Sequence, residues 1–416
     1  MEKLYELYLR HPQICTDTRS IRPGCLFVCL RGERFDGNRF ALDAIGQGAA
    51  LVITENAGLA DNPRCIVVPD ALKALQDLAA HHRRRLKIPI IGITGTNGKT
   101  TTKELMAAVL TKKLRTAFTK GNLNNHIGVP LTLLSIKPSD EIAIVEMGAN
   151  HPGEIEFLCN IARPDYGLIT NVGKAHIEGF GSEAEIIHTK KALYRSVMRD
   201  NGTLFVNHND PKLRDGLDYG HVIYYAEDGE DNIVSMSPYL RIRVCGRETD
   251  THLTGGYNLY NILAAAVVGR HFGVPDDQIA KAIGEYTPSN HRSQISEVRG
   301  NVIISDYYNA NPTSMEAALR NLSQLQHPHK LAILGDMREL GPISRDEHRR
   351  IIRLCEELRI PAWYVGPAFS AQQPEHSYPD ADTLNRHLSE HPITGHMVLV
   401  KGSNSIHLDR LTALLQ

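Results

Sequence analysis

The sequence predicts an α/β protein built from three domains, and three observations support this prediction. The chain has 416 residues, which at about 150 residues per domain favours two or three domains. Short apolar runs alternate with helical stretches along the chain, which is the pattern of α/β sheets. A glycine-rich segment joins one apolar run to one helical stretch near residue 95. We place the domains at residues 1–84, 85–290 and 291–416.

The first block, residues 1–84, has the pattern of a small α/β module. Its strands are expected in three short apolar runs separated by turn-forming residues: 26–30, 49–53 and 65–68. A helix is expected over 71–85. We interpret its basic end, residues 81–85, as a solvated helix terminus rather than a nucleic-acid contact.

The second block, residues 85–290, has the pattern of a phosphate-loop domain with a parallel sheet. Its expected strands are apolar throughout, as strands covered on both faces are: 88–94, 141–147 and 167–172. Its expected helices are 101–114, 188–197 and 258–272.

The third block, residues 291–416, predicts a second open α/β sheet of the Rossmann type. Strands are expected at 302–305, 331–334, 363–365 and 397–400. Helices are expected at 314–325, 345–358, 382–391 and 406–415. No GxGxxG segment follows the first of these strands, so a dinucleotide site is not expected here.

Composition narrows the class of protein. Hydrophobic residues make up 42% and charged residues 22%, which excludes a mostly disordered chain. The formal net charge of −1 gives no general attraction to nucleic acid or to an anionic membrane. No apolar run is long enough for a membrane span, and the first 15 residues lack the apolar core of a signal peptide. The seven cysteines include no CxxC pair, which favours a protein of the reducing cytoplasm. We also expect a monomer.

The strongest local signal is the glycine-rich segment TGTNGKTT, which lies between an apolar strand and an amphipathic helix. Gly95 and Gly98 allow backbone N–H groups to turn toward an anion. Lys99 would neutralise the β- and γ-phosphates, and Thr100 or Thr101 would offer a hydroxyl to Mg²⁺. The segment departs from the usual phosphate-loop spacing at its first glycine.

Two further positions qualify as candidates with less local support, and two lysines do not. Glu146 ends an apolar strand after the phosphate loop, where a carboxylate can hold Mg²⁺. His176 follows another strand, although a lone histidine is more often structural. By composition alone, Lys190 and Lys191 are surface lysines of a helix.

These motifs, in this order, resemble those of the Mur ligases, ATP-dependent amide-forming enzymes of peptidoglycan precursor synthesis. The matching segments are DTR at 17–19, PGCLFVCLRGERFDG at 23–37, TGTNGKTTT at 94–102, NLNNHIGVPLTLL at 122–134, EMGANHPGEI at 146–155, AHIEGFGS at 175–182, GGYNLYNILAAA at 255–266, DYYNANPTSMEAAL at 306–319, GDMRELG at 335–341 and VLVKGSNS at 398–405. They are most similar to the group that adds a D-alanyl-D-alanine dipeptide. The resemblance therefore implies a ligase that joins D-Ala-D-Ala to UDP-N-acetylmuramoyl-tripeptide through an acyl phosphate, with ATP and Mg²⁺.

The resemblance also implies roles for individual residues. ATP would be bound by the loop, by two asparagines and by an arginine at the domain junction: Gly95, Thr96, Asn97, Gly98, Lys99, Thr100, Thr101, Asn258, Asn261 and Arg292. The magnesium ligands would be Thr100, Glu146, His176 and a carbamylated Lys190. Catalytic roles would fall to Lys99, Lys190, Arg292 and Asp306. The substrate would be held by Thr18, Arg19, Asn124 and Asn125, with the UDP end in the first block.

Two alternative functions stay open at this point. One is another ligase of the same superfamily, such as one that adds the third amino acid or one like folylpolyglutamate synthase. The other is an ATP-binding module without catalysis. Residues 61–64 spell DNPR, a diaminopimelate-recognition motif of the third-residue ligases, but they lie in the first block instead of the last. We interpret them as a turn. His126 stands where an acidic residue is common, and its role is open.

Overall fold

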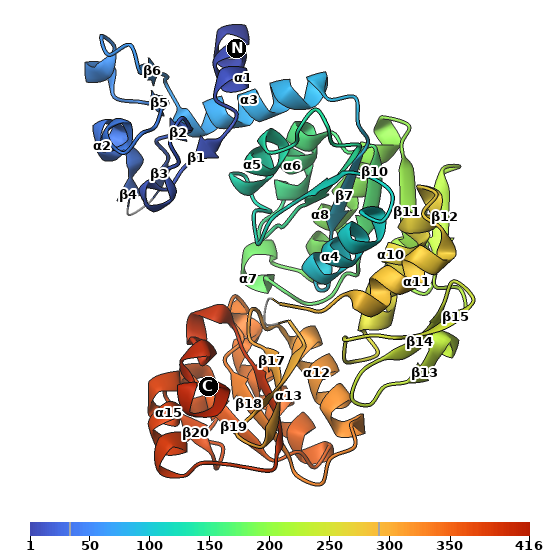
Figure 1. Cartoon of the computed structure of the whole chain (residues 1–416). Helices are drawn as coiled ribbons and strands as arrows, with labels where there is room; N and C mark the ends of the chain where they lie inside the picture. Colours follow the sequence, from blue (N-terminus) through green and yellow to red (C-terminus); the bar gives the residue numbers. More distant parts are fainter. Residues whose placement is uncertain (33–34, 290–291) are drawn as a thin grey trace.

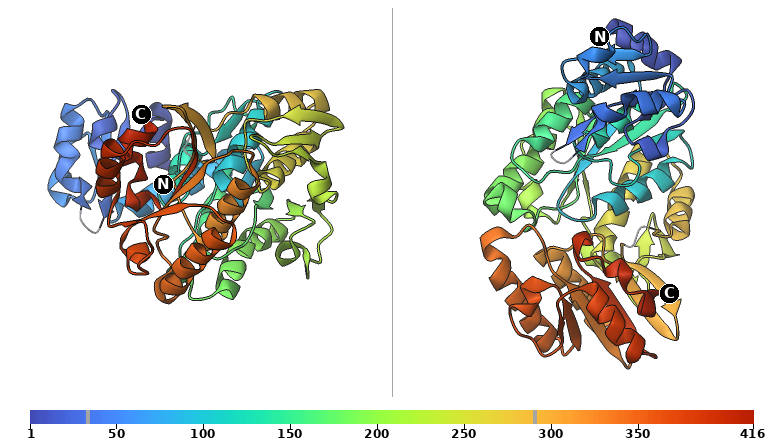
Figure 2. Two further views of the ribbon diagram at one scale, coloured as in Figure 1. Left: turned by 90° about the horizontal axis from the view of Figure 1, so that it is seen from below. Right: turned by 90° about the vertical axis from the view of Figure 1, so that its left-hand side faces the viewer.

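The computed structural model describes residues 1–32, 35–289 and 292–416, and it confirms the three-domain α/β class. In Figure 1 the N-terminal and C-terminal domains lie on the same side of the central domain, with open space between them. The right-hand view of Figure 2 shows the two at opposite ends of an elongated molecule. The expected boundary between the second and third domains, at 290 and 291, lies outside the described residues.

The N-terminal domain is a parallel sheet in the order β1-β2-β5-β6. Its strands are Ile14–Cys15, Leu26–Val28, Leu51–Thr54 and Cys65–Val67. Three of them fall in the predicted apolar runs. The short pair β3 (Arg31–Gly32) and β4 (Phe35–Asp36), the turn η1 (Thr18–Ser20) and the helices α1 (Glu2–Arg10) and α2 (Ala41–Gly46) were not predicted. Asn62 accepts hydrogen bonds from the backbone N–H groups of residues 64 and 65, so the DNPR segment is a turn.

The helix α3 (Ala71–Arg85) has its predicted bounds, but its basic end is solvated only in part, because of residues 81–85 only Arg84 and Arg85 are exposed. His81, His82 and Arg83 are buried. The Arg83 guanidinium donates to the Asp165 carboxylate at 2.8 Å and to the Ala162 carbonyl at 2.9 Å, both in the central domain. The prediction failed because an arginine pairs across a domain boundary that its local sequence does not reveal. The basic run therefore docks the N-terminal domain on the central one.

The central domain is a six-stranded, fully parallel sheet in the order β12-β11-β10-β7-β9-β8. In chain order its strands are Ile90–Thr94 (β7), Thr116–Phe118 (β8), Ile142–Glu146 (β9), Tyr166–Ile169 (β10), Thr203–Asn207 (β11) and Val222–Tyr225 (β12). Neighbouring strand residues point to opposite faces, so Ile90 enters one hydrophobic core and Ile91 the other.

Helices cover both faces of this sheet. One face is covered by α3 together with α5 (Gly128–Leu134), α6 (Glu154–Ala162) and α8 (Glu183–Arg199). The other is covered by α4 (Lys99–Leu110), α10 (Asn258–His271) and α11 (Asp276–Glu285). Short helices α7 (Ile177–Phe180) and α9 (Pro211–Arg214) follow β10 and β11. No helix of the described ranges is long and apolar enough to cross a membrane.

A separate antiparallel sheet in the central domain was not predicted. It consists of β13 (Ile233–Ser235), β14 (Arg241–Val244) and β15 (Arg247–Asp250). The turn between β14 and β15 has positive φ at Cys245 (53°) and Gly246 (71°), as tight hairpins require. A cysteine in that position is an uncommon turn signal, which explains why the hairpin escaped prediction.

The C-terminal domain is a second sheet, ordered β16-β17-β21-β18-β19-β20, in which only β16 is antiparallel. Its strands are Gln294–Val298 (β16), Asn301–Asp306 (β17), Lys330–Gly335 (β18), Ala362–Val365 (β19), Ser377–Tyr378 (β20) and Met397–Lys401 (β21). Helices α12 (Pro312–Gln324) and α13 (Ser344–Glu357) pack on one face, and α15 (Ala381–Glu390) on the other. The short helix α14 (Pro367–Ser370) follows β19.

One predicted helix of this domain, 406–415, is wrong. The segment forms two 3₁₀ turns, Asn404–Ile406 and Leu408–Arg410, before the short helix α16 (Thr412–Leu415). His407 lies between the turns with φ of 58°, a left-handed conformation that no α-helix contains. The apolar spacing of the segment is helical, but the backbone breaks at one residue.

Candidate active site

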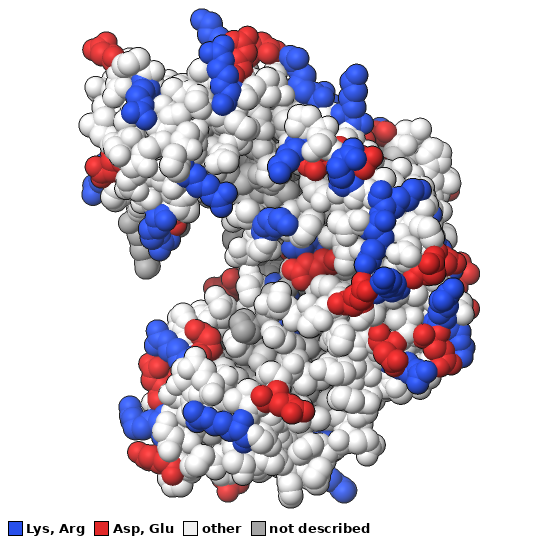
Figure 3. Space-filling view, in the orientation of Figure 1, with Lys and Arg blue, Asp and Glu red and all other residues white. Residues whose placement is uncertain are grey.

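A cavity of about 1230 Å³ lies where the carboxyl ends of the two large sheets face each other. The central domain contributes the loops after β7, β9, β10 and β11. The C-terminal domain contributes Asp306 at the end of β17 and Lys401 at the end of β21. Figure 3 shows the molecule hollowed between its upper and lower parts. Ligands of open α/β sheets bind at such carboxyl edges, so this cavity is the candidate active site.

The glycine-rich loop lines this cavity and ends at the N-terminus of α4. Gly98 is the residue before the helix, with φ of 78°, and no side chain caps the helix there. The free backbone N–H groups and the helix dipole are therefore available to an anion. At Gly95 a Cβ atom would lie 2.0 Å from Oγ1 of Thr170, so no larger residue fits. The loop has the geometry of a phosphate site.

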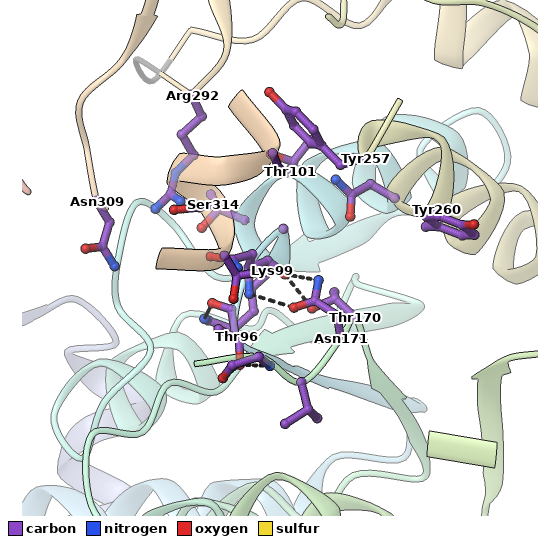
Figure 4. Close-up of a pocket in the computed structure, with 18 of the residues that line it drawn as sticks. Thr96, Lys99, Thr101, Thr170, Asn171, Tyr257, Tyr260, Arg292, Asn309 and Ser314 are labelled. Carbon is purple, nitrogen blue, oxygen red and sulfur yellow. Dashed lines mark hydrogen bonds between the residues drawn. The ribbon is translucent and has the colours of Figure 1, made fainter. Parts of the chain in front are cut away.

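Lys99 is folded back onto its own loop. Its ammonium donates to the carbonyls of Gly95 at 2.7 Å and Thr96 at 3.0 Å. Burial lowers the pKa of Lys99 to about 8, with Glu146 opposing the shift and Arg292 adding to it. Figure 4 shows Lys99 within the cluster of loop side chains. A bound phosphate would replace the two carbonyls as the partner of this cation.

A scaffold behind the loop was not predicted. Thr170 and Asn171 follow β10, and both bond to the backbone of Asn97. The Thr170 hydroxyl donates to the Asn97 carbonyl at 2.6 Å, and the Asn171 amide donates to it at 3.0 Å. The Asn97 side chain pairs with that of Asn311 in the C-terminal domain, with Asn311 Nδ2 at 2.8 Å from Asn97 Oδ1. The loop thus contacts both large domains.

Glu146 is buried at the end of β9, beside the phosphate loop. Its Oε1 accepts from the Asn124 amide at 2.8 Å and from the Thr100 hydroxyl at 3.3 Å. Its Oε2 is buried without a hydrogen-bond partner among the described residues. A buried carboxylate oxygen without a hydrogen bond is costly, and its ion-pair partner is the Lys103 ammonium at 3.6 Å. A metal cation bound to this oxygen would satisfy it further.

Lys103 is a site residue that sequence reasoning missed. Its side chain is 1% exposed, and its ammonium lies 3.6 Å from Glu146 Oε2 and 3.9 Å from a Glu104 oxygen. Burial lowers its pKa, and the two carboxylates oppose that shift. Lys103 is four residues after Lys99 on α4, so the two lie on one helix face. That spacing was the available signal, and a lysine on an amphipathic helix conceals it.

His176 lines the cavity, but its partner comes from the C-terminal domain. Its Nδ1 forms a short bond with the carboxylate of Glu339, in the loop after β18. This bond lowers the pKa of Glu339 more than burial raises it. Within the described part of the chain, no three His, Cys, Asp or Glu side chains converge as a ready-made metal centre. Of the predicted magnesium set, the structure places only Thr100 and Glu146 in direct contact.

Lys190 is buried on α8 with 3% of its surface exposed, unlike its partly exposed neighbour Lys191. Its ammonium lies 3.4 Å from the Ala149 carbonyl, and Ala149 lines the cavity. Burial holds the pKa of Lys190 well below its usual value, and the charge of Lys99 lowers it further. Composition alone suggested a surface lysine, and the structure contradicts that interpretation.

The two asparagines predicted to bind ATP, which the family resemblance assigns to the adenine side, form hydrogen bonds within the protein. Asn258 donates to the Thr254 carbonyl at 2.8 Å, and Asn261 donates to Asn258 at 2.8 Å. The Asn261 oxygen accepts from the Thr102 hydroxyl at 3.0 Å, which ties α10 to α4. Both line the cavity, and both also hold the two helices together.

The two predicted residues at the domain junction also line the cavity. The Arg292 guanidinium stacks over the ring of Tyr308 at 4.0 Å, and Figure 4 shows it reaching from the chain that enters the C-terminal domain. Asp306 pairs with the buried ammonium of Lys401 at 2.6 Å. The Lys401 partner was not predicted. Its sequence signal was only its position at a strand end.

The predicted substrate residues divide between two places. Asn124 and Asn125 line the cavity. Thr18 and Arg19 lie in the N-terminal domain and do not line it, and the Arg19 guanidinium pairs with Asp17 at 2.6 Å on the surface. An extended ligand would be needed to touch both places.

Comparison with known proteins identifies the family. Residues 12–90 match the model described as Mur ligase family, catalytic domain; 93–269 match Mur ligase middle domain; and 291–404 match Mur ligase, glutamate ligase domain. The chain is 32% identical to the UDP-N-acetylmuramoyl-tripeptide–D-alanyl-D-alanine ligase of Bacillus subtilis, over 96% of this chain and 92% of that protein. The chain belongs to the Mur ligase family.

Other Mur ligases agree in sequence and structure. The ligase of the same name from Synechocystis is 35% identical over 98% of this chain and 92% of that protein. MurF from Acinetobacter baumannii superposes with a TM-score of 0.86 at 28% identity, covering 99% of this chain and 97% of that one. MurF from Thermotoga maritima, solved in complex with ADP, gives 0.84 at 27% identity, over 97% and 96% of the two chains.

Proposed function

We propose that this Mur ligase joins D-Ala-D-Ala to UDP-N-acetylmuramoyl-tripeptide with conversion of ATP to ADP and phosphate, in peptidoglycan precursor synthesis. The observation that carries the proposal is the cavity itself. An uncapped glycine-rich loop with Lys99 faces a buried, half-satisfied Glu146, and polar groups of a second sheet close over both. Near full-length similarity to ligases of this name supports the choice of substrates.

The reaction has two steps, and the chain contributes mainly charge and position. The γ-phosphoryl group passes to the terminal carboxylate of the tripeptide, giving an acyl phosphate and ADP. The D-Ala-D-Ala amine then attacks the acyl carbon, and phosphate leaves. Lys99 and Arg292, which both line the cavity, would neutralise the phosphates from opposite domains. Asn97 and Asn311 would keep the two domains in register during the transfer.

The donor set near Glu146 fits Mg²⁺. Oε2 of Glu146, which accepts no hydrogen bond from the described residues, and the hydroxyl of Thr100 are hard oxygen ligands, and His176 lines the same cavity. Magnesium usually takes one or two carboxylates together with substrate phosphates, and Glu146 would be that carboxylate. When bound, magnesium would neutralise charge on the transferred phosphoryl group.

Lys190 is proposed to act as a carbamate. A lysine amine reacts with CO₂ only when neutral, forming a carbamate and releasing a proton. Burial and the nearby charge of Lys99 both favour the neutral amine, because each lowers the pKa of Lys190. The carbamate would carry a negative charge and oxygen ligands next to Ala149 at the cavity wall.

The remaining assignments follow the same proposal. Asn258 and Asn261 would face the adenine side of ATP. Asp306, which pairs with Lys401, would lie near the ribose once the domains have closed around the substrates. The domain at 1–84 would hold the UDP end through Thr18 and Arg19, the domain at 85–290 would bind ATP, and the domain at 291–416 would complete the ligase. A cytoplasmic location is proposed because ATP is the cosubstrate.

An ADP-release assay tests this function against its alternatives. ADP release should require both UDP-N-acetylmuramoyl-tripeptide and D-Ala-D-Ala, and chelation of magnesium should abolish it. A third-residue ligase would instead respond to a diamino acid and the UDP-dipeptide, and a folylpolyglutamate synthase-like enzyme to glutamate. ADP release that does not depend on D-Ala-D-Ala would contradict the proposal.

A further inference from the structure

The loop that follows β18, residues 336–341, reaches across the domain boundary to the segment that carries His176. The Glu339 carboxylate bonds to His176 Nδ1, and the Glu339 carbonyl accepts from the backbone N–H of Glu178 at 3.2 Å. A Cβ atom at Gly341 would lie 3.2 Å from Cβ of Glu178, so the two backbones are packed closely. The C-terminal domain thus contacts the His176 segment through both side chain and backbone.

Both partners of this bond hold an uncommon backbone conformation. His176 has φ of 53° and Glu339 has φ of 61°, a left-handed conformation in which residues other than glycine are uncommon. The Glu339 loop is fixed by its own domain, because Asp336 accepts from two backbone N–H groups of α14 at 2.8 and 2.9 Å. In addition, the Arg338 N–H donates to the Ser403 hydroxyl at 3.0 Å. The loop is therefore a rigid extension of the C-terminal domain.

The Glu339 bond decides which imidazole nitrogen is free. An ionised carboxylate only accepts hydrogen bonds, so Nδ1 of His176 is the donor in this pair, and Nε2 is the ring nitrogen left for another ligand. No side chain of the described ranges bonds to Nε2, and His176 lines the cavity together with Glu146. Histidines that bind metals commonly donate their other N–H to a carboxylate, which orients the ring and raises its basicity.

We propose that Glu339 is a positioning residue that couples docking of the C-terminal domain to the cation site, through the orientation of His176. The carboxylate arrives only with the third domain, so the histidine is held ready for a cation only when that domain is docked. This inference rests on the proposed function, since it assumes a cation between Glu146 and His176.

Cation binding to the full chain tests the inference without measuring catalysis. Mn²⁺ would be titrated in the presence of a non-hydrolysable ATP analogue and followed by electron paramagnetic resonance. Glu339→Gln keeps the size of the side chain but removes its charge, and it should weaken Mn²⁺ binding by about 10–100-fold. Glu339→Asp has a shorter carboxylate, and its Mn²⁺ affinity should lie between those of the wild type and Glu339→Gln. Thermal melting of each variant checks that the fold is intact.

Two further variants make the test decisive. Lys174→Met removes an ion pair across the same boundary, between Lys174 Nζ and Glu347 Oε1 at 3.6 Å, and should leave Mn²⁺ affinity unchanged. An equal loss in Lys174→Met and Glu339→Gln would overturn the inference, because any docking contact would then serve. Wild-type affinity in Glu339→Gln, with loss in Glu146→Gln, would overturn it and leave the proposed function standing. Wild-type affinity in both would overturn the cation site as well.

Discussion

The central and C-terminal domains both face the cavity with the carboxyl ends of their strands, but the N-termini of their first helices, α4 and α12, differ in capping. In the central domain, α4 begins after Gly98 with no capping side chain. In the C-terminal domain, α12 begins with Asn311, whose side chain accepts from the N–H of Ser314, and Pro312 follows. One helix N-terminus is free for a phosphate, and the other is satisfied by its own residues. This difference in capping favours the central domain over the C-terminal one as the place where a phosphate binds.

The largest expected effect comes from removing the cation at the free helix. Lys99→Ala should lower the ligation rate by at least about 10²–10³-fold, because one charge that faces the transferred phosphoryl group is lost from a water-poor site. Initial rates of ADP release would measure this, with circular dichroism to check the fold. Near-normal turnover in a folded variant would remove the α4 terminus from the mechanism.

A comparison of Lys190 with its neighbour Lys191 tests the proposed carbamate at Lys190. Lys190→Ala should be nearly inactive and should recover in part with an added small carboxylate, and wild-type activity should depend on dissolved CO₂. Lys191→Ala should be mild, because that side chain is about 100° around the helix and partly exposed. The reverse ranking of the two variants would contradict the assignment, and full activity in both would exclude a carbamate.

The pH dependence of nucleotide binding sharpens the role of Lys99. The pKa of Lys99 in the free protein is about 8, below its ordinary 10.5, so the cation is lost as pH rises through 8. ADP affinity should then fall, by up to about tenfold per pH unit. Because the unfolded chain binds the extra proton between pH 8 and 10.5, the stability of the free protein should rise there relative to Lys99→Met. Calorimetric unfolding of both proteins at several pH values between about 7 and 9.5 would measure this difference in stability. An affinity that falls equally in Lys99→Met would contradict it.

The smallest expected effect comes from a change at the capped N-terminus of α12. Asn311→Ala removes the cap of α12, which should cost about 1 kcal/mol of stability. It also removes the bond to Asn97, so ligation should slow more than ADP binding weakens. Denaturant unfolding and ADP titration would separate the two. An ADP affinity lowered as strongly as in Lys99→Ala would show that the C-terminal domain shares the phosphate site directly.

Local features of the site could be predicted from the sequence. The glycine-rich loop and Glu146 could be singled out because the apolar strand, the glycines and the charged residue lie close together in the sequence. Over such short spans, the spacing of apolar residues and the turn-forming residues determine the backbone conformation. The helix Ala71–Arg85 was found for the same reason, from its continuous helical pattern.

The partners of these residues could not be predicted, because tertiary contacts set them. Lys103, Glu339 and Lys401 look like surface charges in the sequence, and only the folded domains bring them to Glu146, His176 and Asp306. The break at His407 was missed because one left-handed residue leaves the helical spacing of its neighbours intact.

The most direct test of the account is the mass of the product. The intact protein would be incubated with ATP, Mg²⁺, D-Ala-D-Ala and UDP-N-acetylmuramoyl-tripeptide, and the nucleotide fraction would be examined by mass spectrometry. The account predicts that the UDP-tripeptide is converted to a species heavier by one dialanyl unit, with ADP formed in equal amount. A UDP-tripeptide that keeps its mass while ATP is consumed would contradict it.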